Sequence, residues 1–518
     1  MPDEWFAVEY DVVIIGAGSS GSVIAARASE EPNHSVLLLE AGPDYPLIGE
    51  TPFDLVNSYR NSTADHDWGH AYQPTAEGRP TAFPRGRVTG GSSAVNTTIA
   101  LRGVPEDYDH WAELGNEQWS WERVLPLFNR LERDLDFGHE PYHGDAGPIT
   151  IRRYPHEELS ETHQAFLEAA RGLGYPDCAD QNDPQGWGSG PQPMNKLQRL
   201  RVSTAVGYLA PARIRPNLKI VGDTHCRRFI SDDRGRVTHV EVERNGEVRR
   251  IASKLFVLSA GAIQTPPILW RSGLGPRRAL EDLGIEVVAD VEGVGANLCD
   301  HPALSVIATL KDPSLASSEL PLIQTILRYT APGSEHRNDL QVELITWAQR
   351  ADSPGAFSIA AVLEQSYGRG TVRIDSADPH AQPRIEQHFC EDDRDAMRML
   401  AGFKDALAFV ETEPLASLID ELRFPDPSRG ADDESLLNLI RRLSGSGYHP
   451  CGTARMGPAE DAGAVVDQFG RVHALSGLVV ADASIMPEVP RANTNLTSIM
   501  IGEQIGEWIR TRPGDYGL

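Results

Sequence analysis

One histidine, His449, lies in the segment GSGYHPCGTARMG of residues 445–457, directly before Pro450. Proline disfavours the α region for the residue that precedes it, so Pro450 predicts an extended backbone at His449 and limits where the ring can point. An imidazole with an ordinary pKa of about 6.5 is well suited to accept a proton near neutral pH. His449 is therefore a candidate general base, although a histidine in such a turn can also serve a structural hydrogen bond.

A dinucleotide-binding pattern opens the chain. The apolar run at residues 12–15 predicts a strand, the small residues from about 20 to 28 predict a helix, and the apolar run at 36–39 predicts a second strand. Together they predict one βαβ unit, which is typical of a doubly wound parallel sheet.

The turn of this unit contains the spacing G-x-G-x-x-G at Gly16, Gly18 and Gly21. The first glycine permits a tight turn, the second lets a pyrophosphate approach the backbone, and the third allows the helix to pack closely on the strand. The helix N-terminus offers free N–H groups to phosphates. Glu40 ends the second strand, where a carboxylate can accept hydrogen bonds from a ribose. An acidic residue favours a ribose without a 2′-phosphate, which leaves NAD or FAD.

Composition excludes several functional classes. The chain has 518 residues, which favours two domains, and a formal net charge of −26, which argues against nucleic acid as a partner. Its five cysteines have neither a disulfide-like nor a zinc-like spacing, so we expect no metal site and a reducing compartment. There is no signal-peptide pattern and no apolar run of about 18–20 residues. These features predict a cytoplasmic protein without an integral membrane segment.

The pattern changes between about 305 and 445. Strand-like stretches at 340–350 and 370–376 precede an amphipathic helix at 391–411, which predicts an antiparallel sheet covered by helices on one face. Helical periodicity at about 496–510 returns to α/β character. The predicted fold is α/β (α+β), with a doubly wound FAD/NAD(P)-type dinucleotide-binding domain and a second domain built on the antiparallel sheet. We expect residues 1–155, 195–305 and 446–518 in the first domain, and residues 156–194 and 306–445 in the second.

Four ordered motifs carry a resemblance to a known family. They are GRVTGGSSAVNTTIALRG at 86–103, GAIQTPPILWRSGLG at 261–275, GVGANLCDHP at 293–302, and the closing YHPCGTARMG and VVADASIMPEVPRANTN. They resemble the signatures of the glucose–methanol–choline (GMC) oxidoreductases, and with the glycine motif they run from residue 10 to about 510. The resemblance implies FAD in the first domain and an alcohol substrate over the second.

The resemblance also implies a reaction. His449 would take the hydroxyl proton of a primary alcohol while a hydride passes to flavin N5, giving the aldehyde. The polar group beside the histidine would be Asn493, which can donate and accept hydrogen bonds without titrating. Asn495 is the competing choice, because both residues point the same way in an extended stretch. Reduced flavin would be reoxidised by oxygen, a quinone or another redox partner.

By the same resemblance, the glycine-rich loop at 90–96 would lie against the flavin ring. Some relatives link the flavin covalently through a histidine at the position of Val95, so valine there predicts non-covalent FAD. Asp482 resembles a residue near the phosphate and ribityl portion, with a strand-end cap as the alternative. The residues that the resemblance and the glycine motif assign to the cofactor are Gly16, Gly18, Ser19, Ser20, Gly21, Glu40, Ala41, Trp68, Arg87, Gly90, Gly91, Ser92, Val95, Asn96, Thr97, Cys226, Asp482, Ala483, Asn493 and Thr494.

Some alternatives stay open. The scaffold also serves lyases that cleave cyanohydrins without net redox change, and a third possibility is a non-catalytic flavin-binding protein. We interpret His301 and His143 as structural, and Cys451 as a packed side chain without a base to activate it. The sequence does not identify the alcohol or the electron acceptor, and a monomer or a homodimer is equally compatible with it.

Overall fold

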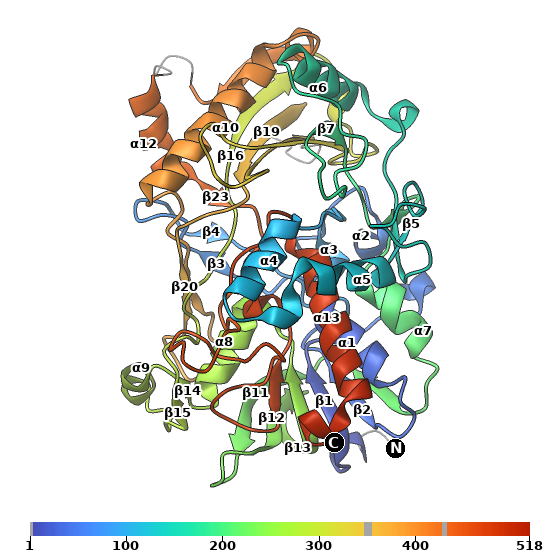
Figure 1. The fold of residues 1–518 in the computed structure, drawn as a ribbon, viewed down its shortest axis with the longest axis vertical. Helices are drawn as coiled ribbons and strands as arrows, with labels where there is room; N and C mark the ends of the chain where they lie inside the picture. The colour runs from blue at the N-terminus through green and yellow to red at the C-terminus, as the bar shows by residue number, and fades with distance from the viewer. Residues whose placement is uncertain (1–3, 347–354, 427–431) are drawn as a thin grey trace.

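The computed structural model describes residues 4–346, 355–426 and 432–518. Within these residues the chain builds two seven-stranded sheets, which lie at opposite ends of the molecule in Figure 1. The first sheet lies near both termini, and the second lies under helices α6 (Glu161–Gly172), α10 (Asp393–Glu411) and α12 (Asp433–Leu443).

The first sheet contains the predicted βαβ unit. Its strand order is β10 (Leu218–Val221), β2 (Val36–Leu39), β1 (Tyr10–Ile15), β13 (Glu247–Leu258), β12 (Val237–Arg244) and β11 (His225–Ser231), and β24 (Leu478–Val480) also pairs with β13. The pairs β10–β2, β2–β1, β1–β13 and β13–β24 are parallel. Strands β1, β2 and β24 and the last four residues of β13 are buried nearly throughout, as expected for parallel strands covered on both faces.

The first sheet has an antiparallel edge beside its parallel part. Strands β11, β12 and β13 are antiparallel neighbours. Asn245 and Gly246 connect β12 to β13 with φ values of +53° and +76°, the left-handed pair that a two-residue hairpin turn requires. This turn reverses the chain before β13 enters the parallel part of the sheet.

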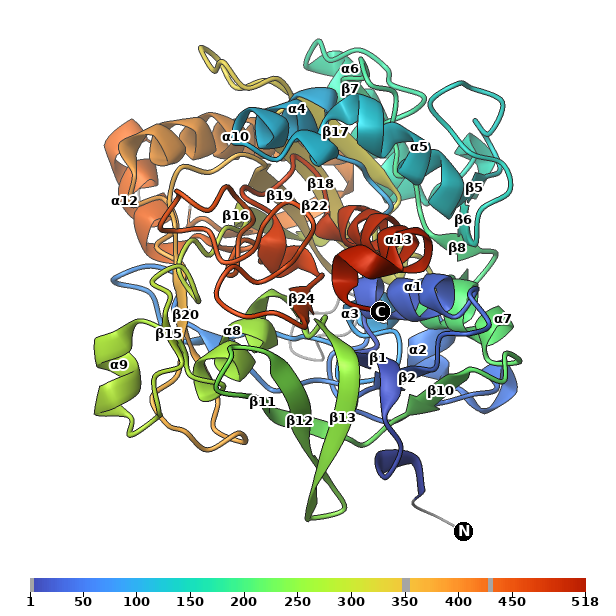
Figure 2. The same cartoon turned by 60° about the horizontal axis from the view of Figure 1, so that its bottom comes forward.

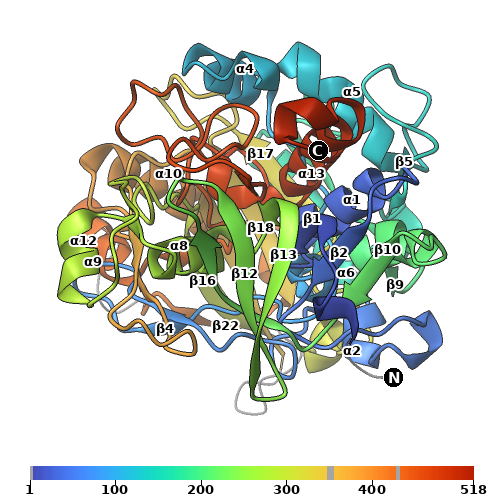
Figure 3. The same ribbon diagram turned by 90° about the horizontal axis from the view of Figure 1, so that it is seen from below.

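Helices α1 (Ser19–Ala28) and α13 (Thr494–Thr511) pack against each other, although they lie at opposite ends of the sequence. They lie side by side in Figures 2 and 3. A Cβ at Gly502 would lie 2.7 Å from the carbonyl oxygen of Ser20, and one at Gly506 would lie 2.9 Å from Cβ of Arg27. The two glycines therefore allow the helices to approach closely, and the predicted helices at 20–28 and 496–510 are confirmed.

The second sheet is antiparallel, as predicted. Its order is β22 (Ile419–Phe424), β16 (Pro302–Leu310), β19 (Ala356–Leu363), β18 (Leu340–Thr346), β17 (Thr325–Tyr329) and β7 (Gly188–Pro191), and β23 (Gly445–Ser446) pairs with β16. Helix α10 confirms the predicted helix at 391–411. The expected strand at 340–350 ends at Thr346, and residues 347–350 lie outside the described residues.

Other elements connect the sheets and carry the site. They include α3 (Ser92–Val95), α8 (Gly261–Arg271) and the small sheet of β20 (Thr371–Arg373) and β21 (Arg384–Glu386), into which the expected strand at 370–376 falls. The expected domain boundary at 305 lies inside β16, because this strand already begins at Pro302. The other boundaries stay a prediction. Among the described helices, none combines the length and apolarity needed to span a bilayer.

Candidate active site

His449 lies in the segment that follows β23, and Asp300 holds this segment in place. Oδ1 of Asp300 accepts the backbone N–H of His449 at 2.9 Å and that of His301 at 2.7 Å. Oδ2 accepts the hydroxyl of Ser446 and the side-chain amide of Gln387. Burial raises the pKa of Asp300 to about 6. One buried carboxyl group therefore fixes the backbone of two histidines that lie far apart in the sequence.

The hydrogen bonds around His449 determine which of its ring nitrogens carries the proton. Nε2 of His301 lies 3.1 Å from the carbonyl oxygen of Pro490, which can only accept, so Nε2 of His301 donates. Burial lowers the pKa of His301 to about 3, so its ring is neutral and Nδ1 is an acceptor. Nδ1 of His449, 2.9 Å away, must then donate to it. The lone pair of His449 is consequently on Nε2, 2.8 Å from Nδ2 of Asn493.

The surroundings of His449 keep its ring neutral. Burial is the first cause that holds the pKa of His449 well below its ordinary value, and the neighbouring His301 and the positive charge of Arg85 add to it. Nη1 of Arg85 donates to the carbonyl oxygen of Tyr448 at 3.0 Å. Tyr448 has φ +68°, a left-handed conformation that costs about 1–3 kcal/mol for a non-glycine residue. The fold therefore holds a strained residue directly before an unprotonated histidine.

The structure separates the two candidate asparagines. Asn493 precedes the first residue of α13, and its side-chain amide contacts His449. Asn495 lies in the first turn of the helix, where its Oδ1 accepts the hydroxyl of Ser19 in α1 at 2.8 Å. The expectation that both point the same way is wrong, because the chain becomes helical between them. Asn493 is therefore the residue beside the histidine.

The turn after β1 and the glycine-rich loop before α3 are in contact. Gly16 has φ +96°, and a Cβ at Gly21 would lie 1.9 Å from the carbonyl oxygen of Gly16. Gly91 has φ +52°, and a Cβ there would lie 2.6 Å from Cα of Gly18. Only glycine fits these conformations and distances. The two loops, which are far apart in the sequence, therefore form one continuous surface at the N-terminus of α1.

This surface suits a phosphate and a ribose. No side chain caps the N-terminus of α1, and its first turn contains no acidic residue, so its positive dipole end is available to an anion. Glu40, at the end of β2, is buried nearby, and its two carboxylate oxygens accept the N–H groups of Ala17 and Gly42 at 2.9 Å. Burial raises the pKa of Glu40 to about 7. Each oxygen retains a second lone pair, which can accept a hydroxyl group.

A pocket of about 100 Å³ lies close to Glu40, because Arg87 lines it. The positive charge of Arg87 opposes part of the rise that burial causes in the pKa of Glu40. The guanidinium carbon of Arg87 lies 5.2 Å from the ring centroid of Trp68, and the rings of Trp68 and His225 are 5.9 Å apart. The remaining lining residues are Gln264, Pro379, His380, Ala381 and Gln382. Cys226 is buried directly after His225 in β11. Planar side chains of this kind suit a flat heteroaromatic ring.

Two models of the GMC oxidoreductase family match the chain, one over residues 10–303 and the other over residues 366–502. The chain belongs to the GMC oxidoreductase family. GMC oxidoreductases bind FAD, and this protein is an FAD-dependent enzyme that acts on CH–OH groups, an alcohol oxidase or dehydrogenase.

Several GMC relatives are similar to the chain over nearly their whole length. A 5-(hydroxymethyl)furfural oxidase of Methylovorus sp. (strain MP688) is 35% identical and covers 97% of this chain and 99% of its own. Oxygen-dependent choline dehydrogenase 1 of Chromohalobacter salexigens is 36% identical, and the match covers 98% of this chain and 96% of the dehydrogenase. The crystal structure of pyridoxine 4-oxidase from Mesorbium loti is 28% identical, has a TM-score of 0.88 and covers 96% of this chain and 98% of its own.

The residues at the N-terminus of α1 fit the FAD of a GMC oxidoreductase. The glycine loops leave backbone groups free of side chains, the helix end is open to a pyrophosphate, and Glu40 has acceptors for a ribose. The backbone N–H of Ala41 faces the carboxyl group of Glu40. Trp68 and Arg87 offer planar groups at the same end. These positions are among those that the sequence assigns to the cofactor.

The residues predicted at the flavin end lie in and after α3. Val95 is buried and packs with Leu55, Val88 and Ala94. Asn96 and Thr97 are partly exposed, the carbonyl oxygen of Asn96 accepts the buried guanidinium of Arg201, and Ser92 accepts the N–H of Gly86. Gly90 has φ +98°. The loop is therefore built from small residues, and its N–H groups at Gly90, Gly91, Ser93, Ala94 and Asn96 donate to carbonyl oxygens within the protein.

Four other predicted positions are occupied by contacts within the protein. The carboxylate of Asp482 accepts hydrogen bonds from the backbone of Gly261 and Ser484 and from the hydroxyl of Thr265, so this residue caps the turn after β24. The hydroxyl of Ser20 donates to the carbonyl oxygen of Ser498 in α13. The carbonyl oxygen of Ala483 accepts the N–H of Gly452, and Thr494 is the first residue of α13. Their cofactor contacts stay predictions.

Three residues around His449, namely His301, Asp300 and Arg85, are not among those that the sequence assigns to the site. His301 was interpreted as structural, but it contacts His449 directly. The available signal was the motif GVGANLCDHP, which contains both Asp300 and His301. The interpretation of His143 as structural agrees with its contacts: it lies with Glu132 and Asp134 in a cluster close enough to share a cation, but Arg102 pairs with Glu132 and Arg153 with Asp134.

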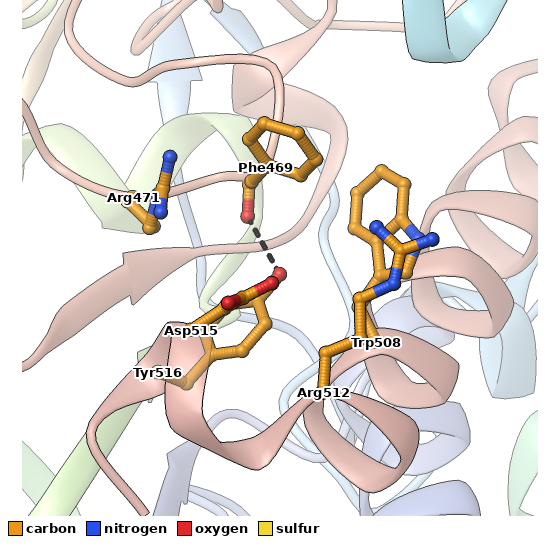
Figure 4. A pocket seen from close by; sticks show the side chains of 6 residues that line it. All are labelled: Phe469, Arg471, Trp508, Arg512, Asp515 and Tyr516. Carbon is orange, nitrogen blue, oxygen red and sulfur yellow. Dashed lines mark hydrogen bonds between the residues drawn. The ribbon is translucent and has the colours of Figure 1, made fainter.

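Figure 4 shows a second pocket, near the C-terminal end of the chain, with none of the candidate site residues in its lining. Its volume is about 20 Å³, enough for about one water molecule. Phe469, Arg471, Trp508, Arg512, Asp515 and Tyr516 line it, and the hydroxyl of Tyr516 donates to the carbonyl oxygen of Phe469 at 3.2 Å. Such a pocket is too small for a substrate.

Proposed function

We propose that this enzyme oxidises a primary alcohol to the aldehyde, with His449 as the general base and Asn493 as its hydrogen-bonding partner. The observation that carries the proposal is the fixed tautomer of His449, whose unprotonated Nε2 lies 2.8 Å from the amide of Asn493. The names of the relatives support it, because a hydroxymethyl group is a primary alcohol.

The roles follow from the chemistry of the side chains. Nε2 of His449 accepts the hydroxyl proton. The low pKa of the ring keeps Nε2 unprotonated at neutral pH, so it can accept. The amide of Asn493 donates to the substrate oxygen and stabilises the charge that develops there. General-base assistance of this kind contributes roughly 10²- to 10⁴-fold to the rate. When bound, FAD supplies the acceptor for the hydride at its N5.

The binding of the cofactor is part of the proposal. The loops at Gly18 and Gly91 would hold the pyrophosphate and approach the ring, and Glu40 would bind the ribose. Valine at position 95 cannot form a covalent bond to the flavin, so FAD is bound non-covalently. Residues 1–155, 195–301 and 446–518 would form the FAD-binding part and residues 156–194 and 302–445 the substrate-binding part.

The electron acceptor is oxygen or another oxidant. One relative is named an oxidase and another an oxygen-dependent dehydrogenase, and these names support oxygen as the electron acceptor.

An anaerobic absorbance titration of the purified holoenzyme with primary alcohols tests the proposal. Bleaching of the flavin band is expected, followed by rapid recovery in air for an oxidase or slow recovery for a dehydrogenase. A lyase would convert a cyanohydrin and leave the flavin oxidised. Absence of bleaching with every alcohol would contradict alcohol oxidation.

A further inference from the structure

The two faces of the second sheet differ in the side chains that they carry. Leu340 of β18 lies on the face that α10 covers, where a Cβ at Gly402 would lie 3.0 Å from Leu340 Cδ2. Side chains alternate between the faces of a strand, so Gln341 and Glu343 lie on the opposite face. We refer to this opposite face as face A. It carries a carboxyl group and an amide inside a sheet whose other face is apolar.

Face A is open toward the active site. Along β16, Ala303, Ser305 and Ile307 are partly exposed, whereas Leu304 and Val306 between them are buried. β16 is an interior strand, so alternate exposure means that face A is accessible. Ala303 pairs with Gly445 of β23, the strand that leads to His449. Ala360 of β19 pairs with both Ser305 and Glu343, so a row of small side chains leads from the His449 segment to Glu343.

Two charged residues connect this face to the catalytic pair. Oε2 of Glu364 lies 3.5 Å from Nδ1 of His301, and the charge of Glu343 influences Glu364. Nη2 of Arg328, which pairs with Gln341 across β17 and β18, donates to the carbonyl oxygen of Arg491 at 2.8 Å. Arg491 is on the segment that carries Asn493. Contacts therefore link face A to the segments that carry His449 and Asn493.

The polar groups at the far end of face A lack partners. Glu343 is 9% exposed, its contact is the amide nitrogen of Gln192 at a long 3.5 Å, and no described cation pairs with it. Oε1 of Gln192 and Oε1 of Gln341 are buried without a hydrogen bond. Buried polar atoms are nearly always paired in folded proteins. Unpaired groups gathered on one open face therefore indicate that a ligand supplies the missing partner.

The unpaired atoms share one property: they accept hydrogen bonds. Because the amide nitrogen of Gln192 faces Glu343, its oxygen must point elsewhere. We propose that Glu343, Gln192 and Gln341 form the distal end of the substrate pocket and select alcohols that carry a hydrogen-bond-donating group, an amino or a second hydroxyl group, remote from the carbon that is oxidised. This inference rests on the proposed function and names its substrate class.

The chemistry of Glu343 separates the two kinds of donor. Burial alone raises its pKa to about 7, so the pairing of its carboxylate with an ammonium group would favour the ionised form. A hydroxyl group can donate to the carboxyl or to either amide oxygen without any change of charge. A carboxylate at the same end of a substrate would be repelled by the ionised form of Glu343 and would be disfavoured.

The test is anaerobic stopped-flow reduction of the holoenzyme with 1-pentanol, 1,5-pentanediol and 5-amino-1-pentanol, extended to the C4 and C6 series. We expect the rate constant of reduction divided by the apparent Kd to be at least about 10-fold higher for one of the donor-bearing alcohols than for the simple alcohol of equal length. Equal values throughout all three series would overturn the proposal.

Variants assign the preference to Glu343. Glu343→Leu should remove the difference between donor-bearing and simple alcohols in the rate constant of reduction divided by the apparent Kd. Glu343→Gln keeps the volume and an acceptor, so it should remove this difference for the amino alcohol alone. Glu421→Gln on the exposed edge strand β22 is the matched control and should keep all ratios. A ratio unchanged in the folded Glu343→Gln and Glu343→Leu proteins would contradict the role. If Glu343→Leu does not fold, Gln341→Leu replaces it, with the same expected loss.

A binding measurement separates this proposal from the proposed function. Pentylamine and pentanoate cannot be oxidised as alcohols, and their binding is followed through the absorbance of the oxidised flavin. Tighter binding of pentylamine, weakened at least about 10-fold by Glu343→Gln, would support the subsite even if no alcohol reduced the flavin. Equal binding of both ions, unaffected by Glu343→Gln, would reject an ammonium subsite even if simple alcohols were oxidised.

Discussion

Nδ1 of His301 and Nδ1 of His449 face each other at 2.9 Å, with ring centroids 5.0 Å apart and ring planes at 67°. A hydrogen bond between two ring nitrogens requires a proton on one of them. His301 uses its own N–H to bind the carbonyl oxygen of Pro490, so the shared proton belongs to His449. His301 thus determines which ring nitrogen of His449 is left unprotonated.

Replacement of His301 should therefore slow catalysis, although both residues that are proposed to act on the substrate are kept. His301→Leu leaves the N–H of His449 unpaired and lets the other tautomer form, so we expect flavin reduction to slow by roughly 10- to 100-fold. His301→Asn retains an acceptor and should recover most of the rate. Stopped-flow absorbance measures both variants, with the remote buried residue His163 changed to Asn as control. Equal losses in His301→Leu and His301→Asn would indicate a merely structural role.

The two asparagines near the start of α13 should have separate effects. Asn493→Ala removes the donor beside His449 and should lower the rate constant of flavin reduction by roughly 10²- to 10³-fold. Asn495→Ala removes the contact with Ser19 and should chiefly weaken retention of FAD. Reduction kinetics and the flavin-to-protein absorbance ratio distinguish the two. A larger kinetic loss in Asn495→Ala would reverse the assignment.

On the acid side of the pH–rate profile, the rate should begin to fall only at an unusually low pH. Because the pKa of His449 is held well below 6.5, its Nε2 remains unprotonated as the pH falls through that value. Protonation removes the acceptor, so the rate decreases only at lower pH. We expect the rate constant of flavin reduction to be constant from about pH 8 to about pH 6.5. A midpoint at or above pH 6.5 in rapid-mixing experiments would contradict the pKa shift.

The contact between Gly18 and Gly91 should be intolerant of a methyl group. Gly91→Ala places a Cβ 2.6 Å from Cα of Gly18 in a left-handed conformation, so the loops must separate. We expect loss of bound FAD and a lower melting temperature. Gly246→Ala is the matched control: its φ is +76° but its Cβ meets nothing, so only the conformational cost of about 1–2 kcal/mol applies. Full flavin content in Gly91→Ala would show that the loops can move apart.

The flavin should leave the protein when the fold is destroyed. Val95 offers no nucleophile for a covalent link, so precipitation with acid should release FAD into the supernatant. Absorbance spectra of the supernatant and of the redissolved pellet measure the distribution. A flavin that stays with the pellet after repeated washing would require a link through another residue.

Much of the FAD-binding part could be predicted because its constraints are local. Glycines at a fixed spacing, apolar runs of strand length and a carboxylate at the strand end are adjacent in the sequence and act together in one βαβ unit. The antiparallel second sheet was also predictable from its period-two alternation and the amphipathic helix that follows. In both cases the sequence pattern and the burial of each element agree.

The arrangement around His449 could not be predicted, because it depends on tertiary contacts. His301 lies 148 residues before His449, and nothing near either residue indicates that they meet. The left-handed φ of Tyr448 is unusual for tyrosine and is imposed by its surroundings. Asn493 and Asn495 were inseparable because the choice depends on the residue at which α13 begins.

The last segment of the chain supplies β24, α13, His449 and Asn493, although α1 and β1, against which it is assembled, come first. During translation, a ribosome that has added residue 444 has made every described strand of the antiparallel sheet except β23, but neither His449 nor Asn493. The nascent chain therefore holds no base while its cofactor site is still incomplete. With the proposed roles of these two residues, interrupted synthesis should yield inert fragments, and activity should start only after the final helix has left the exit tunnel.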